Sequence, residues 1–227
     1  MKLILYGIAV LVVLAVCAEI LYSAYLRYQR QRLLRYWARR HRLRIRPTQD
    51  PTFREDYPMF DCLHRGQDQF ASNIMTGKLH GLDITAFDYH YRRDGGKHST
   101  EHVFSALIAC SPLQLQPLSL RPETALDKVS EFLGIDDIDF ESAEFSRRFY
   151  VKADDKRWAY AVLHQRAMDH LLESPEFSLQ FDWGHVIAWR PRQFDAADFD
   201  DAARVIKGLV DLLPEYLKDR QAELTWR

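Results

Sequence analysis

The chain has 227 residues, with 31 basic and 32 acidic side chains and a formal net charge of −1 at pH 7. This length accommodates one terminal segment and one domain with a substantial core. Residues 1–46 are strongly basic, whereas residues 47–227 are acidic overall. The acidic part makes nucleic acid an unexpected partner, because nucleic-acid-binding proteins cluster Lys and Arg against the phosphates.

The first 26 residues predict a single transmembrane helix. Residues 3–26 are nearly all Leu, Ile, Val, Ala or Tyr, and as a helix they extend about 36 Å, enough to cross a bilayer with some tilt. Tyr22, Tyr25 and Tyr28 fall at the end of the run, where aromatic rings favour the headgroup level. Glu19 is the main polar interruption. An acid within a membrane is a functional candidate, but its position near the end of the span favours exposure at the interface.

A basic juxtamembrane segment, residues 27–46, follows directly. Arginines in this segment are expected to contact anionic lipid headgroups, at about 1 kcal/mol each near the surface: Arg27, Arg30, Arg32, Arg35, Arg39 and Arg40. Because Lys2 alone lies on the other side of the span, the positive-inside rule predicts an external amino terminus and a cytoplasmic carboxyl-terminal domain. The expected location is therefore the inner (plasma) membrane.

A cleaved signal peptide is the alternative interpretation of the first segment. Residues 16–18, Val-Cys-Ala, resemble a small-residue cleavage site, but the arginine block just downstream opposes translocation. Cys17, Cys62 and Cys110 are odd in number and widely spaced, so they form neither a disulfide framework nor a CxxC metal motif.

Residues 47–227 are expected to form one soluble α+β domain, an antiparallel sheet with helices packed on it. The span should continue as a helix through residue 41, followed by a short strand at 43–46 and a loop at 47–68 that packs on the domain. The tight turn at His80–Gly81 predicts a hairpin, and the remaining pattern predicts strands at 73–79, 82–92, 100–110, 113–120 (an edge strand bracketed by prolines), 144–152, 177–183 and 185–189. Helices are expected at 124–133, 154–173 and 199–213.

Four segments resemble an uncharacterised family of bacterial single-pass membrane-anchored proteins that has no assigned activity. They are residues 73–77 (NIMTG), 87–91 (FDYHY), 139–151 (DFESAEFSRRFYV) and 159–163 (AYAVL). The resemblance spans roughly residues 40–215. It implies the same architecture and transfers no catalytic, cofactor or metal residue.

The most prominent group of candidate site residues is rich in histidine. It comprises His80, His90, His98 and His102, with Asp88 and Glu101 nearby. Pairing through residues 94–96 would place His90 opposite Glu101, and a one-residue slip would place it opposite His102. Strand parity puts Asp88 and His90 on one face, expected to be wet, and Phe87, Tyr89 and Tyr91 on the core face. We therefore expect solvent-facing histidines and no metal, cofactor or catalytic residue.

Three further features have simpler interpretations. The acidic run Asp136, Asp137, Asp139, Glu141 and Glu144 lacks the register of a calcium loop and is expected to be a solvated connector. Arg147 and Arg148, within the expected strand 144–152, could bind a phosphate or carboxylate, although at least one should face water. Trp183 and Trp189 could form a recognition surface, but burial in the core is favoured.

These observations favour a membrane-anchored, non-catalytic binding module with a protein partner. The sequence contains no P-loop, GxGxxG, HExxH or GxSxG motif. The alternatives are a membrane-tethered hydrolase or metal-dependent enzyme that uses the hairpin histidines, and a lipid-binding or assembly module.

Overall fold

The structure is a computed structural model, which describes residues 2–95, 99–111, 113–123, 138 and 140–217, without the side chains of residues 2–5, 7–10 and 12. An eight-stranded antiparallel sheet has the order β1-β2-β3-β4-β8-β7-β5-β6. Its strands are β1 (Arg44–Arg46), β2 (Gln67–Leu79), β3 (Leu82–Asp94), β4 (Ser99–Cys110), β5 (Leu118–Pro122), β6 (Phe149–Ala153), β7 (Ser178–Asp182) and β8 (His185–Arg190). The helical elements are α1 (Lys2–Arg40), α2 (Phe53–Asp56), η1 (Asp61–His64), α4 (Ala143–Arg148), α5 (Lys156–Val162), α6 (Gln165–Glu173) and α7 (Ala196–Leu212). The predicted α+β class and antiparallel sheet are confirmed.

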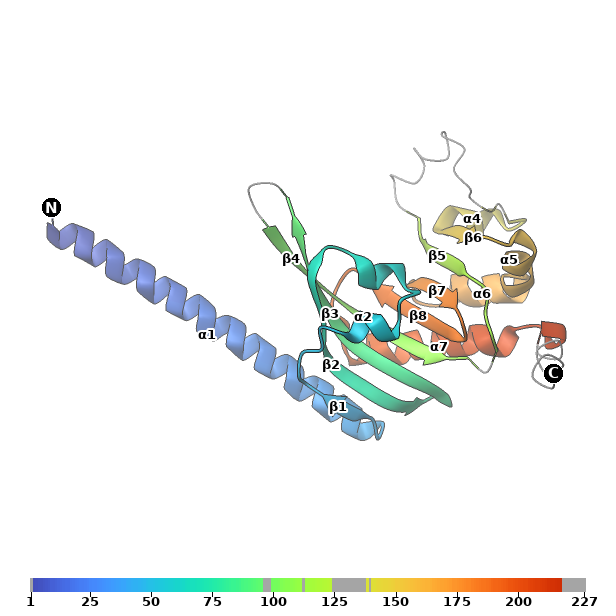
Figure 1. The fold of residues 1–227 in the computed structure, drawn as a ribbon, viewed down its shortest axis with the longest axis horizontal. Coiled ribbons are helices and arrows are strands. Elements are labelled where there is room, and N and C mark those ends of the chain that lie inside the picture. The colour runs from blue at the N-terminus through green and yellow to red at the C-terminus, as the bar shows by residue number, and fades with distance from the viewer. Residues whose placement is uncertain (1, 96–98, 112, 124–137, 139, 218–227) are drawn as a thin grey trace.

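Helix α1 projects from the domain along most of its length (Figure 1). It ends where Arg42 adopts a positive φ of 56° and the Leu43 N–H donates to the Ala38 carbonyl at 2.8 Å, a helix-closing arrangement of the Schellman type. Its continuation to residue 40 confirms the prediction of an unbroken helix. Among the residues whose side chains the structure describes, no helix is both long enough and apolar enough to cross a bilayer.

The sheet is buried on both faces over β2, β3, β4 and β8, which distinguishes this part from the half-wet sheet expected. On one face the carboxyl-terminal part of α1, together with α4, α5, α6 and α7, packs over the strands in a single large core. On the other face the segment that contains α2 and η1 covers β2, β3, β4 and β8 through Phe53, Phe60 and Leu63. The predicted packing of the 47–68 loop on the domain is thereby confirmed.

The packed unit starts before residue 47. Leu34, Trp37 and Ala38 of α1 are buried in the larger core, and β1 pairs with β2 in the register Ile45↔Met75. The boundary expected at residue 47 therefore lies inside the folded domain.

Two expected elements have a different secondary structure. Residues 144–152 were expected as one strand, but they begin as α4, whose amino-terminal cap is Ser142, and continue as β6. The expected helix over 154–173 is two helices, because the chain turns out of helical geometry at Leu163 and His164.

The expected edge strand is also displaced. Strand β5 begins at Leu118 and is paired on both sides, with β6 and β7, so β6 forms the edge on that side of the sheet. The expected helix at 124–133 and the acidic residues Asp136, Asp137 and Asp139 lie outside the described residues.

Candidate functional site

A buried ion pair joins α1 to the centre of the sheet. Asp88 of β3 is 0% exposed, and the Arg30 guanidinium donates to it twice, from Nε at 2.8 Å and from Nη2 at 2.5 Å. This bidentate geometry is the strongest form of arginine–carboxylate contact. Arg30 also donates from Nη1 to the Phe194 carbonyl at 2.8 Å, which connects α1 to the chain just before α7.

Polar groups from the neighbouring strands complete the coordination of Asp88. Asn73 donates from Nδ2 at 2.9 Å, and Ser105 donates from its hydroxyl at 2.5 Å while accepting from the Phe194 N–H at 2.9 Å. Asn73 has a positive φ of 50° at the β-bulge of β2, a conformation that Asn tolerates better than most residues. Every oxygen of the buried carboxylate therefore has a partner, as burial of a charge requires.

The wet-face expectation for Asp88 is wrong, because α1 and α7 cover that face. Phe87, Tyr89 and Tyr91 do lie in the core, as predicted.

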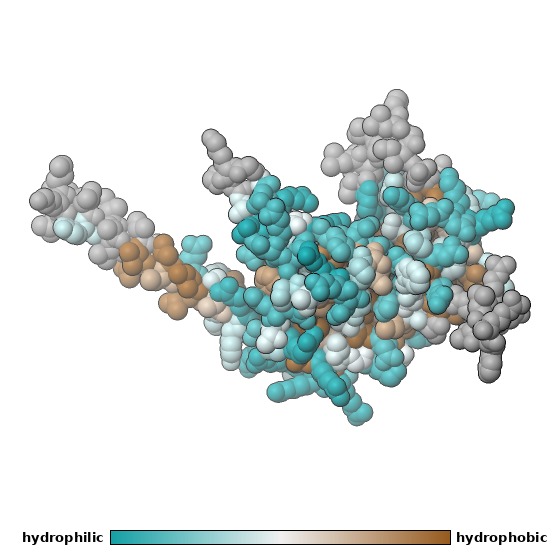
Figure 2. Space-filling view, viewed as in Figure 1, coloured by the Kyte–Doolittle hydropathy of each residue, from teal (hydrophilic) through white to brown (hydrophobic). Residues whose placement is uncertain are grey.

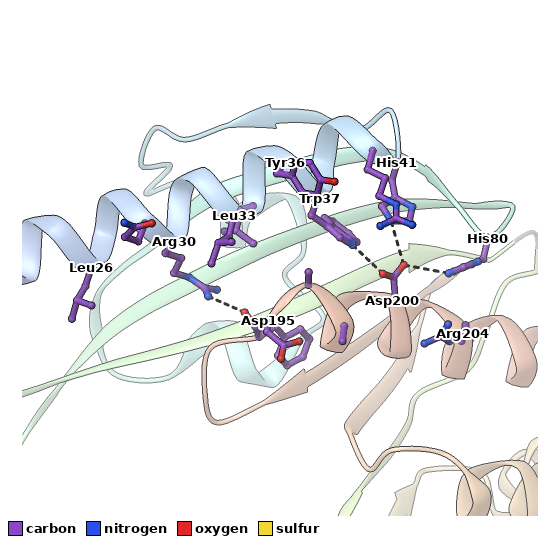
Figure 3. Close-up of a pocket in the computed structure, with 16 residues that line it drawn as sticks. Leu26, Arg30, Leu33, Tyr36, Trp37, His41, His80, Asp195, Asp200 and Arg204 are labelled. Atoms are coloured by element: carbon purple, nitrogen blue, oxygen red, sulfur yellow. Dashed lines mark hydrogen bonds and ion pairs between the residues drawn. The ribbon is translucent and has the colours of Figure 1, made fainter.

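A cleft of about 880 Å³ lies between α1 and the beginning of α7 (Figure 3). Helix α7 begins three residues before the predicted position, because the Asp195 and Asp198 side chains and backbone N–H groups form a reciprocal capping box. The α1 wall of the cleft runs from Leu26 to His41, and Phe194 and Ala197 contribute to the opposite wall.

One end of the cleft is polar and is centred on Asp200 (Figure 3). The Trp37 indole donates to Asp200 Oδ2 at 3.1 Å. The Nε2 atoms of His41 and His80 lie 3.6 and 3.5 Å from Asp200 Oδ1. That oxygen is buried and has no hydrogen-bond partner among the described residues. The two imidazole rings therefore face this buried oxygen from the end of α1 and from the turn between β2 and β3.

The predicted histidine group does not converge. His80 faces Asp200, while His90 lies on β3, where its ring stacks on Phe70 at 4.4 Å between centroids and contacts Glu101 at 3.3 Å. His102 stacks on Tyr91 at 5.1 Å. His98 lies outside the described residues. Among the residues that are described, no group of three or more His, Cys, Asp or Glu side chains is suited to a metal ion, and the expected lack of metal stays a prediction.

Neither proposed register of the hairpin is correct. Tyr91 pairs with His102 and Arg92 with Glu101, while His90 pairs with Val103. Strand β3 ends at Asp94 and β4 begins at Ser99. The contact between His90 and Glu101 is consequently diagonal across the strands.

The juxtamembrane arginines occupy different environments. Arg30 is held by Asp88, and the remaining five are exposed: Arg27, Arg32, Arg35, Arg39 and Arg40. Arg40 also lines the cleft. Contact of these side chains with lipid stays a prediction, and the engagement of Arg30 within the domain leaves it little freedom to reach a headgroup.

The other candidate residues have structural roles or face solvent. Arg147 and Arg148 are in the last turn of α4, where Arg148 pairs with Glu176 at 2.9 Å. Trp189 is partly buried under the Arg65 guanidinium, but Trp183 is 70% exposed, contrary to the expected burial, because it occupies the β7–β8 turn with a positive φ of 45°.

Sequence reasoning missed the three residues that organise this site, namely Arg30 as an internal ligand, Trp37 and Asp200. A signal was present in β3, where Leu82, Ile84 and Ala86 precede Asp88 at alternate positions. An acid that continues an apolar face indicates a buried carboxylate with a cationic partner.

No protein-family model matches the sequence, and no match is found among curated proteins. The structure is similar to the crystal structure of the mycobacterial trehalose monomycolate transport factor A, TtfA, with a TM-score of 0.57 and 16% sequence identity. The similarity covers 81% of this chain and 93% of that one. At this identity it establishes a shared fold alone, and the resemblance to the uncharacterised membrane-anchored family stays a prediction.

Proposed function

We propose that this protein is a membrane-anchored, non-catalytic binding module that holds its domain beside the bilayer for a partner protein. The observation that carries the proposal is the apolar part of α1 that lies outside the domain. Leu11 is 66%, Ile20 58% and Leu21 70% exposed, and Figure 2 shows this apolar stretch projecting from the domain. A contiguous apolar surface of this kind indicates a membrane or protein interaction.

The composition of α1 favours the membrane over a protein as the environment of its first part. The run of residues 3–26 is apolar around the whole circumference of the helix rather than along one stripe, which is typical of a span. The arginines that follow would then lie at the cytoplasmic headgroups, with the amino terminus outside. The membrane would thus be the inner (plasma) membrane.

The ion pair between Arg30 and Asp88 supports an accessory rather than a catalytic role for the most buried polar group. Every Asp88 oxygen is already bonded to protein atoms, so the carboxylate has no free lone pair directed at a substrate. The pair fixes the domain relative to the anchor. The similar mycobacterial protein is called a transport factor, which fits an accessory role.

Crosslinking in native membranes tests the partner. A tagged full-length protein should retain a defined protein partner after crosslinking and detergent extraction. Two variants carry matched changes at separate exposed sites. One is Trp183→Ala at the β7–β8 turn, and the other is altered at Gln165. If crosslinking recovers no more partner protein than an unrelated single-pass control protein does, the proposal of a binding module is contradicted.

Topology is tested separately. A reporter that is active only in the cytoplasm should be active when it is fused after residue 227, because the basic residues flank one side of the apolar run. Digestion of the domain by protease added outside intact cells would contradict the proposed orientation.

A further inference from the structure

We propose that a basic pocket on the polar face of β5, β6 and β7 binds the phosphate group of a small soluble phosphomonoester. The pocket has a volume of about 190 Å³, which is below the roughly 300–1,000 Å³ of sites for drug-sized ligands. It therefore suits one charged group with a small substituent. The inference adds a ligand to the proposed binding module and does not depend on the identity of the protein partner.

The pocket lies where the cover formed by α2 and η1 ends. In the part of the chain that the structure describes, the apolar core beneath these elements includes no residue of β5, β6 or β7. The pairing register continues the same sheet face from Ile187 of β8 to Gln180 of β7 and Ser119 of β5. The Gln180 side chain accepts from the Asp61 N–H at 3.1 Å and donates to the Met59 carbonyl at 2.7 Å. Helix η1 is thus held as a wall beside the polar strands.

Three basic side chains line the pocket, namely Arg65, Arg121 and Lys152. Aromatic rings hold the two guanidinium groups. The Arg65 Cζ lies 4.4 Å from the centroid of the Trp189 ring, and the Arg121 Cζ lies 4.5 Å from that of Tyr150. A ring covers one flat side of a guanidinium, while the N–H donors point outward in its plane, where oxyanions bind.

The positive charge of this pocket favours an anion of high charge. Neither Arg65 nor Lys152 forms an ion pair within the described residues, and Asp61 is the one acid among those that line the pocket. The pairing of β5 with β6 makes Arg121 and Lys152 diagonal neighbours on one face, within reach of each other as long side chains. Like charges repel at this spacing. A phosphomonoester, with a charge of about −1.5 to −2 at pH 7, relieves that repulsion.

Hydroxyl groups add neutral hydrogen-bond donors to the site. Ser119 and Ser178 line the pocket from the neighbouring strands β5 and β7. The three acceptor oxygens of a phosphate group can bond to guanidinium, ammonium and hydroxyl donors together. A carboxylate has two oxygens and a single charge, so a phosphomonoester is the better match.

The position of the pocket favours a soluble ligand over a lipid head group. The pocket lies on the sheet face opposite the one that α1 covers. Strands β5 and β6 are also at the end of the domain away from the projecting part of α1 (Figure 1). A phosphate of the anchoring membrane would have to pass the whole domain to reach it. This choice of source rests on the proposed anchor, whereas the anion site itself does not.

Calorimetric titration of the full-length protein in phosphatidylcholine nanodiscs measures the binding. The titrants are glycerol 3-phosphate and glycerate, which carry a phosphate and a carboxylate on skeletons of similar size. We expect glycerol 3-phosphate to bind with one site per chain and a Kd below about 1 mM. Glycerate should bind at least about tenfold more weakly, because it has fewer acceptor oxygens and less charge. Equal affinity for the two titrants would overturn the phosphate site.

Variants that remove one charge locate the site. Arg65→Gln should weaken the binding of glycerol 3-phosphate about tenfold or more, the effect of losing a hydrogen bond between charged groups. Lys152→Gln should weaken it about threefold, because solvent screens an exposed charge, and it keeps the test decisive if Arg65→Gln unfolds. Arg157→Gln and Lys156→Gln are the matched controls, at exposed positions of α5 outside the pocket, and should leave the affinity unchanged. Equal weakening by pocket and control variants would overturn the site.

A last comparison separates the two sources of phosphate. Part of the nanodisc lipid is replaced by phosphatidic acid, a lipid phosphomonoester, or by phosphatidylglycerol at the same total charge. Glycerol 3-phosphate should bind equally in both. Loss of binding with phosphatidic acid alone would show that the pocket takes a lipid head group and would overturn the soluble ligand. None of these outcomes affects the crosslinking and topology experiments, which test the proposed function.

Discussion

Asp88 is the residue on which the docking of α1 depends. It is fully buried, and its charge is compensated mainly by one guanidinium from a helix far away in sequence. Removal of one partner from a buried pair is costly because the other charge is left without compensation.

We expect Arg30→Ala to lower the free energy of unfolding by about 3–5 kcal/mol, the typical effect of breaking a buried pair. Arg32→Ala, at an exposed position of the same helix, is the matched control and should change it by about 0.5 kcal/mol or less. Urea denaturation of the two variants measures the difference. The double variant Arg30→Ala, Asp88→Ala should be less destabilised than the sum of the single variants, and strict additivity would contradict a coupled pair.

Asp198 gives a prediction about pH. Burial acts to raise the pKa of this carboxyl, but hydrogen bonds from Arg192 and from the Asp195 backbone, with the charges of Arg192 and Arg190, outweigh it and lower the pKa below its ordinary value of 3.8. A lowered pKa contributes stability that is fully present above about pH 4 and is lost as the pH falls through the folded-state value.

The Asp198→Asn variant should therefore be less stable than the parent protein at pH 7, by about 1–3 kcal/mol for bonds to a charged group. The difference should shrink as the pH falls below about 4, where the carboxyl is protonated first in the unfolded parent chain and then, at lower pH, in the folded one. Thermal unfolding from pH 3 to pH 7 measures it, and a difference that is independent of pH would contradict this account.

The cysteines test the smaller core, which lies between the sheet and the segment that contains α2 and η1. Cys62 is buried beneath the segment of α2 and η1, and burial raises the pKa of its thiol to about 12. At pH 8 the folded protein should react with iodoacetamide at Cys110, which is exposed, while Cys62 should react only after unfolding, because the thiolate is the nucleophile. Modification of Cys62 at the rate of Cys110 in native protein would show that this segment does not cover the sheet.

At the residue scale, the sequence predicted which side chains of β3 share a face and that Phe87, Tyr89 and Tyr91 are buried, but not that the opposite face, with Asp88, is buried as well. Period-two alternation assigns the two faces of a strand without identifying what packs on each. The cover on the Asp88 face comes from α1, which the sequence presented as a membrane and headgroup element. An arginine in a basic run can either contact lipid or form an ion pair inside the domain. Only the fold distinguishes the two.

At the element scale, the long strands, the hairpins at His80–Gly81 and Gly184, and the last helix were predictable because each carries turn residues or strong periodicity. The short elements were not. Residues 143–153 change from α4 to β6 at Phe149, and in so few residues a buried helix and a buried strand give the same apolar pattern. The capping residue Ser142 was the available signal.

The carboxyl-terminal part of α1 and β1 are expected to be required for folding. A fragment of residues 47–227 loses the buried Leu34 and Trp37 and leaves Asp88 without Arg30, a combined loss of more than about 5 kcal/mol, comparable to the whole stability of many domains. Residues 27–227 should unfold cooperatively in urea, whereas residues 47–227 should aggregate or show no cooperative transition. Equal midpoints for the two fragments would contradict this role of α1.

At the scale of the whole molecule, α1 is a continuous helix with two environments. Its apolar first part has little domain surface to pack on (Figure 2), and its last turns are part of the core. Composition alone predicted the division into a basic segment and an acidic domain, but it placed the boundary at residue 47. The actual packing begins in α1, because Leu34, Trp37 and Ala38 form an apolar stripe within a sequence dominated by arginine.

Vesicle flotation tests the anchor most directly. Full-length protein and the chain of residues 27–227 are mixed with vesicles of phosphatidylcholine and phosphatidylglycerol, and each is then washed at high salt and at alkaline pH before flotation. We predict that the full-length protein floats and resists both washes, because its apolar run is inserted, whereas the shortened chain is released by salt, which screens its arginines. Release of the full-length protein by either wash, or equal retention of the shortened chain, would contradict membrane anchoring through α1.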